Sequence, residues 1–201
     1  MLRLKNVCLL VVGLFTQSLS AEEAVAAAPA ESPKLETTVR VVEQAGHESI
    51  RHACFALGPN KFAFVVPPGF RLDIATDERV VLVNKDFTCL ISLRIAAPAT
   101  PEAQRAALLT RYPGAKILEE LPLAVANQNG QMFDLQCATE GVVRFARAAF
   151  IPSPAGVLEF TLLSSPDKFR EVQADFSFLL QTLRTSDATQ ELKVIAFADQ
   201  S

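Results

Sequence analysis

The chain has 201 residues, of which 50% are hydrophobic, with 14 phenylalanines, one tyrosine and no tryptophan. This length suits a single domain with short appendages, and the apolar content allows a core that needs neither metals nor many disulfides. The formal net charge of −3 argues against nucleic acid and against an acidic membrane surface as partners.

Residues 1–20 have the three parts of an export signal. Arg3 and Lys5 form a positively charged start, an apolar stretch covers 7–15, and small residues follow. A bilayer core takes about 20 apolar residues to span, so this stretch is short for a permanent anchor. We expect a cleaved signal peptide, with cleavage after Ser20 or the following alanine, and a periplasmic or secreted product. An uncleaved anchor is the alternative, and no later segment is apolar enough to form an integral membrane segment.

Composition divides the remainder of the chain into three parts. Residues 21–38 are rich in Ala, Glu and Pro and predict a disordered linker. Residues 39–186 contain the regular apolar patterns and are expected to form a single α+β domain. Residues 187–201 form a C-terminal tail, for which a short edge strand and a loose end both remain open.

Alternation of apolar and polar residues predicts the strands of this domain. Turn residues lie between them, among them Gly58-Pro59-Asn60, Lys85-Asp86 and Asn129-Gly130, the last of which is a strong hairpin signal. We expect strands at 52–57, 61–66, 79–84, 87–95, 142–151 and 157–163.

The stretch VPPGF at 66–70 interrupts the aromatic alternation of the second expected strand. Prolines cannot donate hydrogen bonds to a ladder, so Pro67 and Pro68 predict the end of the strand. Gly69 allows a sharp turn, after which Phe70 can fold back onto the core. We interpret the stretch as structural, with a place on a partner-facing rim as the alternative.

Two helices are predicted from capping residues and helical spacing. Thr100 can cap the first, with Pro101 at its first position, and this helix is expected to stop before Pro113. The second is expected to be capped by Ser165 and opened by Pro166. Its apolar residues recur at helical spacing and are Phe169, Val172, Phe176, Leu179 or Leu180, and Leu183.

The connections between neighbouring strands are too short for parallel crossovers, so the pairing is expected to be mostly antiparallel. The predicted fold class is therefore α+β, an antiparallel sheet flanked by helices.

A metal site is the first chemistry to consider, because His47, His52 and Cys54 lie close together in the sequence. A stable site needs three or four converging ligands, and a strand at 52–57 brings only two of these side chains onto one face. We therefore predict no metal and no cofactor.

Cys54, Cys89 and Cys137 follow the expected signal. An oxidising compartment permits one disulfide and leaves one thiol over, but the sequence does not determine the pairing. Cys89 and Cys137 lie on apolar faces of expected strands, which favours small buried hydrophobic residues. One disulfide among the three is the alternative.

The sequence contains no recognisable motif for nucleophilic or acid–base catalysis. Ser164 and Ser165 precede a helix without a G-x-S-x-G elbow, and adjacent Glu119-Glu120 point to opposite sides of a strand. Arg144 and Arg147 are likewise expected on opposite faces, which disfavours a shared anion site. We predict no catalytic residue and a protein that is not an enzyme.

An aromatic strand ending in Pro-x-Gly-aromatic, followed much later by a Ser/Pro turn and a helix, resembles the PsbP-like superfamily. This group includes extrinsic photosystem subunits, a Ran-binding protein and bacterial DcrB-type exported proteins, and the resemblance covers about residues 52–186. It implies an α/β/α sandwich and an accessory or binding role without catalysis; no functional residue is transferred. The matching residues are Phe62, Phe64, Pro67 or Pro68, Gly69 and Phe70, then Phe169, Phe176, Leu179, Leu183 and Ser186.

Together these observations predict an exported, non-enzymatic binding or accessory protein that acts on another envelope or extracellular protein. A small-molecule or lipid-binding domain with a Phe-lined crevice is one alternative. A hydrolase with an unrecognised site is another.

Overall fold

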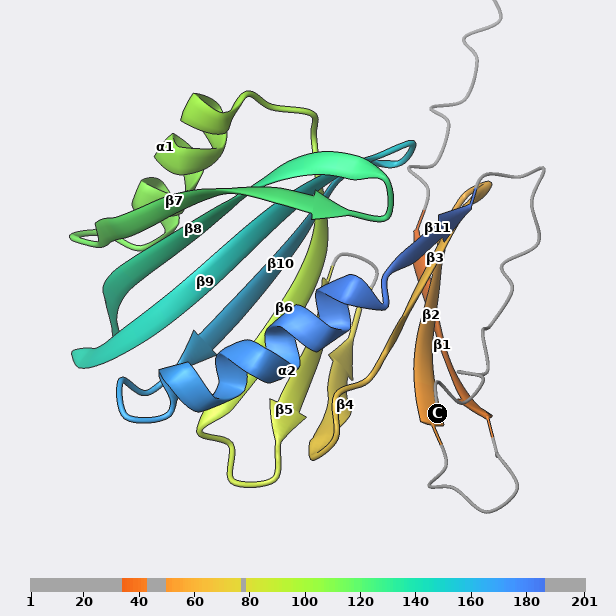
Figure 1. The fold of residues 1–201 in the computed structure, drawn as a ribbon, viewed down its shortest axis with the longest axis horizontal. Helices are drawn as coiled ribbons and strands as arrows, with labels where there is room; N and C mark the ends of the chain where they lie inside the picture. Colours follow the sequence, from red (N-terminus) through yellow and green to blue (C-terminus); the bar gives the residue numbers. More distant parts are fainter. Residues whose placement is uncertain (1–33, 43–49, 77–78, 187–201) are drawn as a thin grey trace, which may run out of the picture. The chain divides into compact units, whose positions relative to one another are not determined.

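The computed structural model describes residues 34–42, 50–76 and 79–186, and these form two antiparallel sheets and two helices (Figure 1). In chain order the elements are β1 (Leu35–Val42), β2 (Ile50–Leu57), β3 (Asn60–Val65), β4 (Phe70–Ala75), β5 (Arg79–Asn84), β6 (Cys89–Ala96), α1 (Pro101–Arg111), β7 (Lys116–Val125), β8 (Gln128–Thr139), β9 (Val142–Ser153), β10 (Gly156–Ser164), α2 (Phe169–Gln181) and β11 (Arg184–Ser186).

The larger sheet has the strand order β4-β5-β6-β10-β9-β8-β7, and all of its pairs are antiparallel. The chain leaves β6 through α1, enters the far edge as β7, and returns hairpin by hairpin to place β10 beside β6. Short hairpin loops require antiparallel neighbours, which is why this return path forms readily. The predicted class, an antiparallel fold with two helices, is confirmed at this level, but the strands are divided between two sheets rather than one.

The smaller sheet has the order β1-β2-β3-β11. The three-residue strand β11, which the sequence did not predict, follows α2 and pairs with β3. Near this junction the backbone N–H of Val65 donates to the hydroxyl of Thr182 at 3.0 Å. The smaller sheet is thereby tied to the C-terminal end of α2.

Strand β1 corrects the predicted linker of 21–38, because residues 35–38 belong to the smaller sheet. Leu35 is only 6% exposed, and the following Thr and Val residues are β-branched and favour strands. The predicted export signal of 1–20, with its cleavage position, and the tail of 187–201 lie outside the described residues.

The main hydrophobic core lies on the face of the larger sheet that α2 covers. Ring contacts connect the two sheets there, since the Phe64 and Phe160 ring centroids are 5.6 Å apart in an edge-to-face arrangement. The helical spacing predicted for this helix is confirmed, because its buried residues are Phe169, Val172, Phe176, Leu179 and Leu180.

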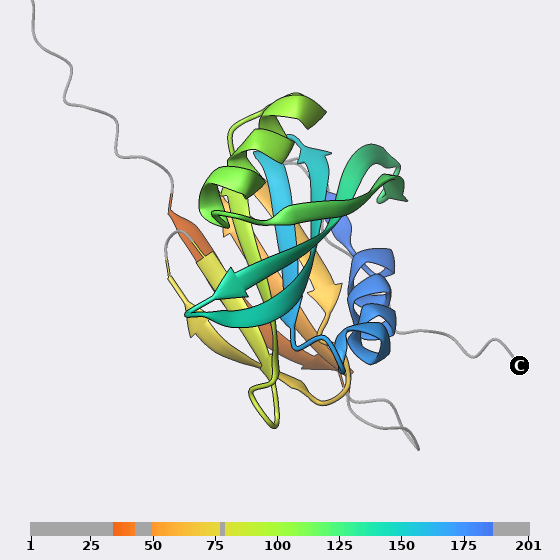
Figure 2. The same cartoon turned by 90° about the vertical axis from the view of Figure 1, so that its left-hand side faces the viewer.

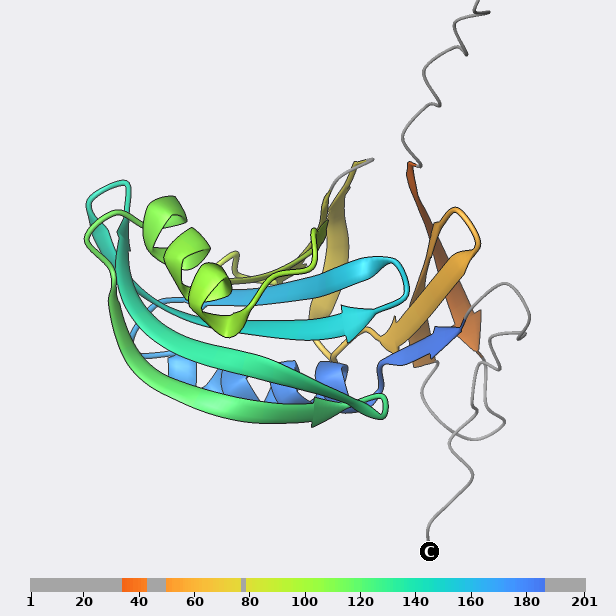
Figure 3. The same ribbon diagram turned by 90° about the horizontal axis from the view of Figure 1, so that it is seen from above.

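A second, smaller core lies between α1 and the opposite face of the larger sheet, and its strand residues belong to β8, β9 and β10. Successive side chains of a strand point to opposite faces, so Val157 joins this core while Leu158 joins the main one. Figures 2 and 3 show α1 and α2 against different sides of the larger sheet. Helix α1 contributes little to its core, because only Gln104 and Leu108 are buried on it.

The two helices begin differently. The hydroxyl of Thr100 accepts a hydrogen bond from the N–H of Ala103 at 3.3 Å, which confirms the predicted cap of α1. The predicted cap of α2 is wrong, because that helix begins at Phe169 with Lys168 at the capping position. Ser165 instead opens a separate turn, in which its carbonyl accepts from the N–H groups of Lys168 and Phe169.

The turn between β7 and β8 also differs from the prediction. Ala126 and Asn127 form it with φ angles of 52° and 60°, while Asn129-Gly130 lies inside β8. A Cβ on Gly130 would lie 2.2 Å from the carbonyl oxygen of Phe150. The glycine therefore serves the close approach of two strands rather than the turn.

The VPPGF stretch adopts the structure expected of a strand end. The N–H of Phe70 donates to the carbonyl of Pro67 at 3.1 Å, and Gly69 has a φ of 81°, as a type II turn requires. Phe70 is buried, and the guanidinium of Arg51 donates to its carbonyl at 2.7 Å. In the part of the chain that the structure describes, no helix is both long and apolar enough to cross a membrane.

Candidate functional site

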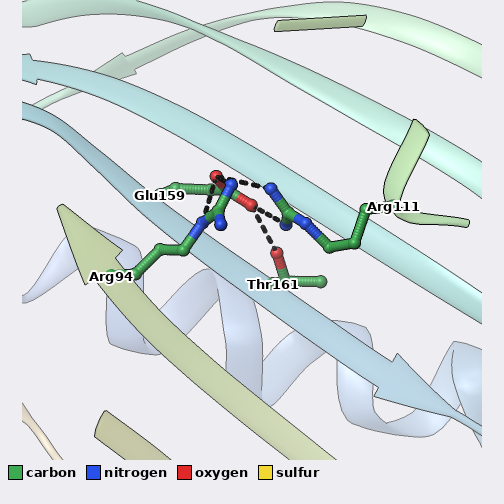
Figure 4. Close-up of polar contacts among 4 residues, drawn as sticks. All are labelled: Arg94, Arg111, Glu159 and Thr161. Atoms are coloured by element: carbon green, nitrogen blue, oxygen red, sulfur yellow. Dashed lines mark hydrogen bonds and ion pairs between the residues drawn. The ribbon is translucent and has the colours of Figure 1, made fainter. Parts of the chain in front are cut away.

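A buried carboxylate forms the centre of the strongest polar cluster on the α1 side of the larger sheet (Figure 4). Glu159 lies on β10, and its side chain is 1% exposed. Arg94 lies directly opposite it on β6, and Arg111 is the last residue of α1. Two strands and one helix therefore each supply a charged side chain to this cluster.

The carboxylate of Glu159 is saturated with donors. Arg94 donates from Nε to Oε2 at 2.7 Å, and Arg111 donates to both carboxylate oxygens, with a distance of 3.2 Å to Oε2. The hydroxyl of Thr161 donates to Oε1 at 3.3 Å. Burial raises the pKa of Glu159, and the hydrogen bonds and charge of Arg111 act in the opposite direction.

This arrangement holds two guanidinium groups in fixed positions with part of each facing solvent. The side chain of Arg94 is 41% exposed and that of Arg111 is 28% exposed. A guanidinium has five N–H donors, so each arginine keeps donors beyond those that reach Glu159. The cluster can receive a carboxylate or phosphate group from outside, whereas a carboxylate already held by two arginines is a poor general base.

The histidines considered for a metal site do not form one in the described residues. His47 lies outside them, and His52 is buried on β2 at 5% exposure. Burial lowers the pKa of His52, and its Nε2 is buried without a hydrogen-bond partner among the described residues. Cys54 is half-buried on the same strand, and no group of three metal-ligating side chains is present among these residues.

Cys89 and Cys137 are buried, at 2% and 4% exposure, and both keep free thiols, so they form no disulfide with each other. Their placement agrees with the interpretation as small apolar core residues. The thiol of Cys89 lies 3.2 Å from the hydroxyl of Ser164, and burial raises the pKa of Cys137. A raised pKa makes a thiol less nucleophilic at neutral pH.

The remaining candidates are placed in pairs that do not converge. Glu119 and Glu120 lie on the edge strand β7, and Glu120 forms an ion pair with Arg105 of α1 at 2.9 Å. Arg144 and Arg147 lie on β9 and contact different residues. The guanidinium of Arg147 donates to both oxygens of Asp134, at 2.7 and 2.6 Å, whereas Arg144 is paired in register with Cys137.

No motif in the sequence marks Glu159, Arg94 or Arg111 as site residues. A signal was available, since Glu159 interrupts the apolar run VLEFTLL and Arg94 interrupts the apolar end of its strand. A charge within a run that is otherwise buried needs a partner of opposite charge. Only the register of β10 against β6 identifies which arginine that partner is.

No protein-family model matches the chain, and no curated protein matches it. Among solved structures, it is similar to the cyanobacterial PsbP (CyanoP) of Synechocystis, with 11% identity, 80% of this chain and 98% of that chain covered, and a TM-score of 0.45.

It is also similar to LpqN, a protein involved in cell envelope biogenesis of Mycobacterium tuberculosis, with 10% identity, 76% and 91% of the two chains covered, and a TM-score of 0.42. The immunity protein TplEi of the T6SS of Pseudomonas aeruginosa has 11% identity, 72% and 75% coverage, and a TM-score of 0.38. With TM-scores below 0.5, these likenesses carry no argument about fold or function.

Proposed function

We propose that this chain is an exported, non-enzymatic binding or accessory protein that acts on another protein of the cell envelope or outside the cell. The observation that carries the proposal is the pair of partly exposed guanidinium groups that buried Glu159 holds in place. Arginine is enriched at the centres of protein interfaces, because its planar donors pair with carboxylates in a defined geometry.

A pre-positioned arginine loses less conformational entropy on binding than a mobile one. Arg94 and Arg111 are each held by the same carboxylate, so their donors are ordered before a partner arrives. The net negative charge of the chain disfavours nucleic acid, which leaves carboxylate groups on a protein as the ligands that fit best.

Export rests on the basic, apolar and small-residue pattern of residues 1–20. The finer description of the fold is also part of the proposal. We assign the larger sheet with α1 and α2 to the α/β/α sandwich of the PsbP-like superfamily, because the two helices belong to different core clusters on alternate strand residues.

Two alternatives are less well supported by the described residues. The phenylalanines expected to line a ligand crevice pack against one another, as in the stacked pairs of Phe55 with Phe62 and with Phe64. A hydrolase based on imidazole would need an accessible histidine, and His52, the histidine within the described residues, is buried. Neither observation favours a second candidate function.

The test is chemical crosslinking of the tagged chain in the cells that encode it, followed by purification and identification of the partner. We expect a partner whose recovery falls as the salt concentration rises, because exposed charge pairs are screened. We also expect Arg94→Gln to weaken binding of the purified partner about tenfold, since hydrogen bonds to charged groups are worth more than about 1.4 kcal/mol.

Arg105→Gln is the matched control, because it removes the same charge from the same side of the sheet. The Arg105 side chain is 49% exposed and forms an ion pair with Glu120 rather than with Glu159. Equal loss of binding in Arg94→Gln and Arg105→Gln would show that binding depends on the overall positive charge of this side and not on the arginine held by Glu159. A chain that stays monomeric and uncrosslinked, or that turns over an ester, peptide or phosphate substrate, would contradict the proposal.

A further inference from the structure

Three turns meet at one end of the larger sheet, and together we call them the Phe87 end. They are the turn at 67–70, the tip of the β5–β6 hairpin at 84–89, and the turn at 165–168 that leads into α2 (Figure 1). Strand pairing brings them together, because Phe70 is paired with Asn84 and Cys89 with Ser164. The two stretches that resemble the PsbP-like pattern therefore lie beside a third turn that the pattern does not include.

Phe87, at the tip of this hairpin, is the most exposed large hydrophobic side chain of the described residues, at 62%. Its φ angle is 54°, in the left-handed region that bulky residues rarely adopt. Glycine or asparagine would satisfy this turn without strain and without exposing an aromatic ring. Folding alone therefore does not explain a phenylalanine here, and residues held in sparsely populated backbone conformations cluster at functional sites.

The turn is held by Asn84, which fixes the position from which the ring projects. The backbone N–H of Phe87 donates to the carbonyl of Asn84 at 3.2 Å. The side chain of Asn84 donates to the hydroxyl of Thr88 at 2.9 Å and accepts from the N–H of Cys89 at 3.1 Å. Since the backbone is fixed on both sides, docking the ring orders little additional chain.

Arg71 lies beside the exposed ring, with its guanidinium carbon 4.9 Å from the centre of the Phe87 ring. Arg71 is itself exposed, so its planar donors are accessible next to an aromatic surface. Phenylalanine and arginine are both enriched at protein–protein interfaces relative to the rest of the surface.

The charges around the ring are mixed in sign, which argues for a protein rather than a lipid surface. Together with Arg71, the exposed residues Lys85, Asp86, Asp167 and Lys168 contribute three positive and two negative charges. The hydrogen bond to Glu171 is the main cause of the raised pKa of Lys168, and the negative charge of nearby Asp86 adds to it. Attraction to anionic lipids needs a cluster of basic residues, and stable insertion needs more apolar surface than one ring.

We propose that the Phe87 end is a docking surface for the folded partner protein of the proposed function, which supplies an apolar pocket for the Phe87 ring and a carboxylate for Arg71. This inference rests on the proposed function in that the partner is a protein. It adds a surface distinct from the arginine cluster around Glu159, because Cys89 and Arg94 lie toward opposite ends of β6.

The test uses Phe87→Gly, because glycine adopts a positive φ without strain and so keeps the fold intact. The partner identified by crosslinking is purified, and its dissociation constant is measured for the wild type and for each variant. We expect Phe87→Gly to raise the dissociation constant at least tenfold while the chain's resistance to urea stays unchanged or increases. Arg71→Gln is expected to raise the dissociation constant by a smaller factor. The control is Phe178→Ser, which removes another exposed ring, on α2, and is expected to leave binding unchanged. Serine is used instead of glycine because glycine would weaken the helix.

Several outcomes would overturn the inference. A partner that binds Phe87→Gly as tightly as the wild type leaves the proposed function standing and removes this surface. A loss of stability in Phe87→Gly would show that the ring supports the fold. Binding of the wild-type chain to vesicles of phosphatidylethanolamine and phosphatidylglycerol that Phe87→Gly abolishes would assign the ring to a lipid surface, and a dimer that Phe87→Gly dissociates would assign it to a second copy of the chain.

Discussion

The two faces of the larger sheet are covered by one helix each, but the helices are held in different ways. Helix α2 buries a row of large apolar side chains against strands that offer aromatic rings in return. Helix α1 buries only Gln104 and Leu108, and it is joined to the sheet by the ion pairs Arg105–Glu120 and Arg111–Glu159. Apolar area thus holds α2, whereas α1 depends on charged groups whose partners had to be placed individually.

The largest expected effect is on the α2 face. Phe160→Ala removes a fully buried ring that contacts Phe64, so we expect the free energy of unfolding to fall by about 3–5 kcal/mol. Urea denaturation followed by circular dichroism measures this. A loss below about 1 kcal/mol would show that the main core does not depend on this ring, and Phe160→Leu gives a milder variant if the alanine variant does not fold.

On the α1 face, Glu159→Ala is expected to lower the free energy of unfolding by about 1–3 kcal/mol. The loss is smaller than for most buried pairs, because Arg94 and Arg111 are partly exposed and water can solvate them once Glu159 is gone. Hydrogen exchange should show the amides of α1 losing protection before those of α2, since α1 has few other buried contacts.

Glu171→Ala is the matched control for this change, because it removes a carboxylate from the exposed pair with Lys168. Exposed pairs contribute less than about 1 kcal/mol, so this variant should stay close to the wild type. If both variants lose the same stability, or if α1 keeps its protection in Glu159→Ala, the charged cluster does not hold the helix.

His52 in the smaller sheet offers a contrast to Glu159, because it is buried and its Nε2 has no hydrogen-bond partner among the described residues. Burial lowers its pKa, so the unfolded chain binds a proton at His52 at a higher pH than the folded chain does. The stability that this group supports is present above about pH 6.5 and is lost as the pH falls below that value.

We therefore expect the free energy of unfolding to drop more between pH 7.5 and 5.5 in the wild type than in His52→Gln. Urea titrations at the two pH values measure the difference. A wild-type dependence that His52→Gln retains in full would assign it to other groups.

The smallest effect is expected at Phe178, which is 37% exposed on the outer side of α2. Phe178→Ala should lower the free energy of unfolding by less than about 1 kcal/mol, because the ring is only partly covered and alanine has a higher helix propensity than phenylalanine. A loss close to that of Phe160→Ala would mean that the outer side of α2 is covered in solution.

The two faces of the larger sheet also differ in how well the sequence predicts them. The main core followed from spacing, since alternate strand residues and the helical repeat of α2 marked the buried positions correctly. The charged cluster on the α1 side could not be read in this way, because spacing alone assigns Glu159, Arg94 and Arg111 to a surface. Charged residues become buried only when the fold brings opposite charges together.

Local errors had the same origin. Asn129-Gly130 has the composition of a hairpin turn, but the turn lies at Ala126-Asn127 and the glycine serves the close approach to Phe150. Ser165 has the composition of a helix cap, but α2 begins at Phe169. In both places a short-range preference was overridden by the register of neighbouring elements, which depends on how larger apolar faces fit.

By itself, the sequence determined the strands and helices whose signals act within a few residues: the Thr100 cap, the turn at Pro67–Phe70 and the apolar alternation of β6 and β10. The tertiary structure decided which strands are neighbours. Arg94 and Glu159 are 65 residues apart and meet only because β10 returns beside β6, and the same return places Phe87 next to the turn that precedes α2. Pairing between distant strands is set by the total fit of the buried faces, and no local pattern contains that information.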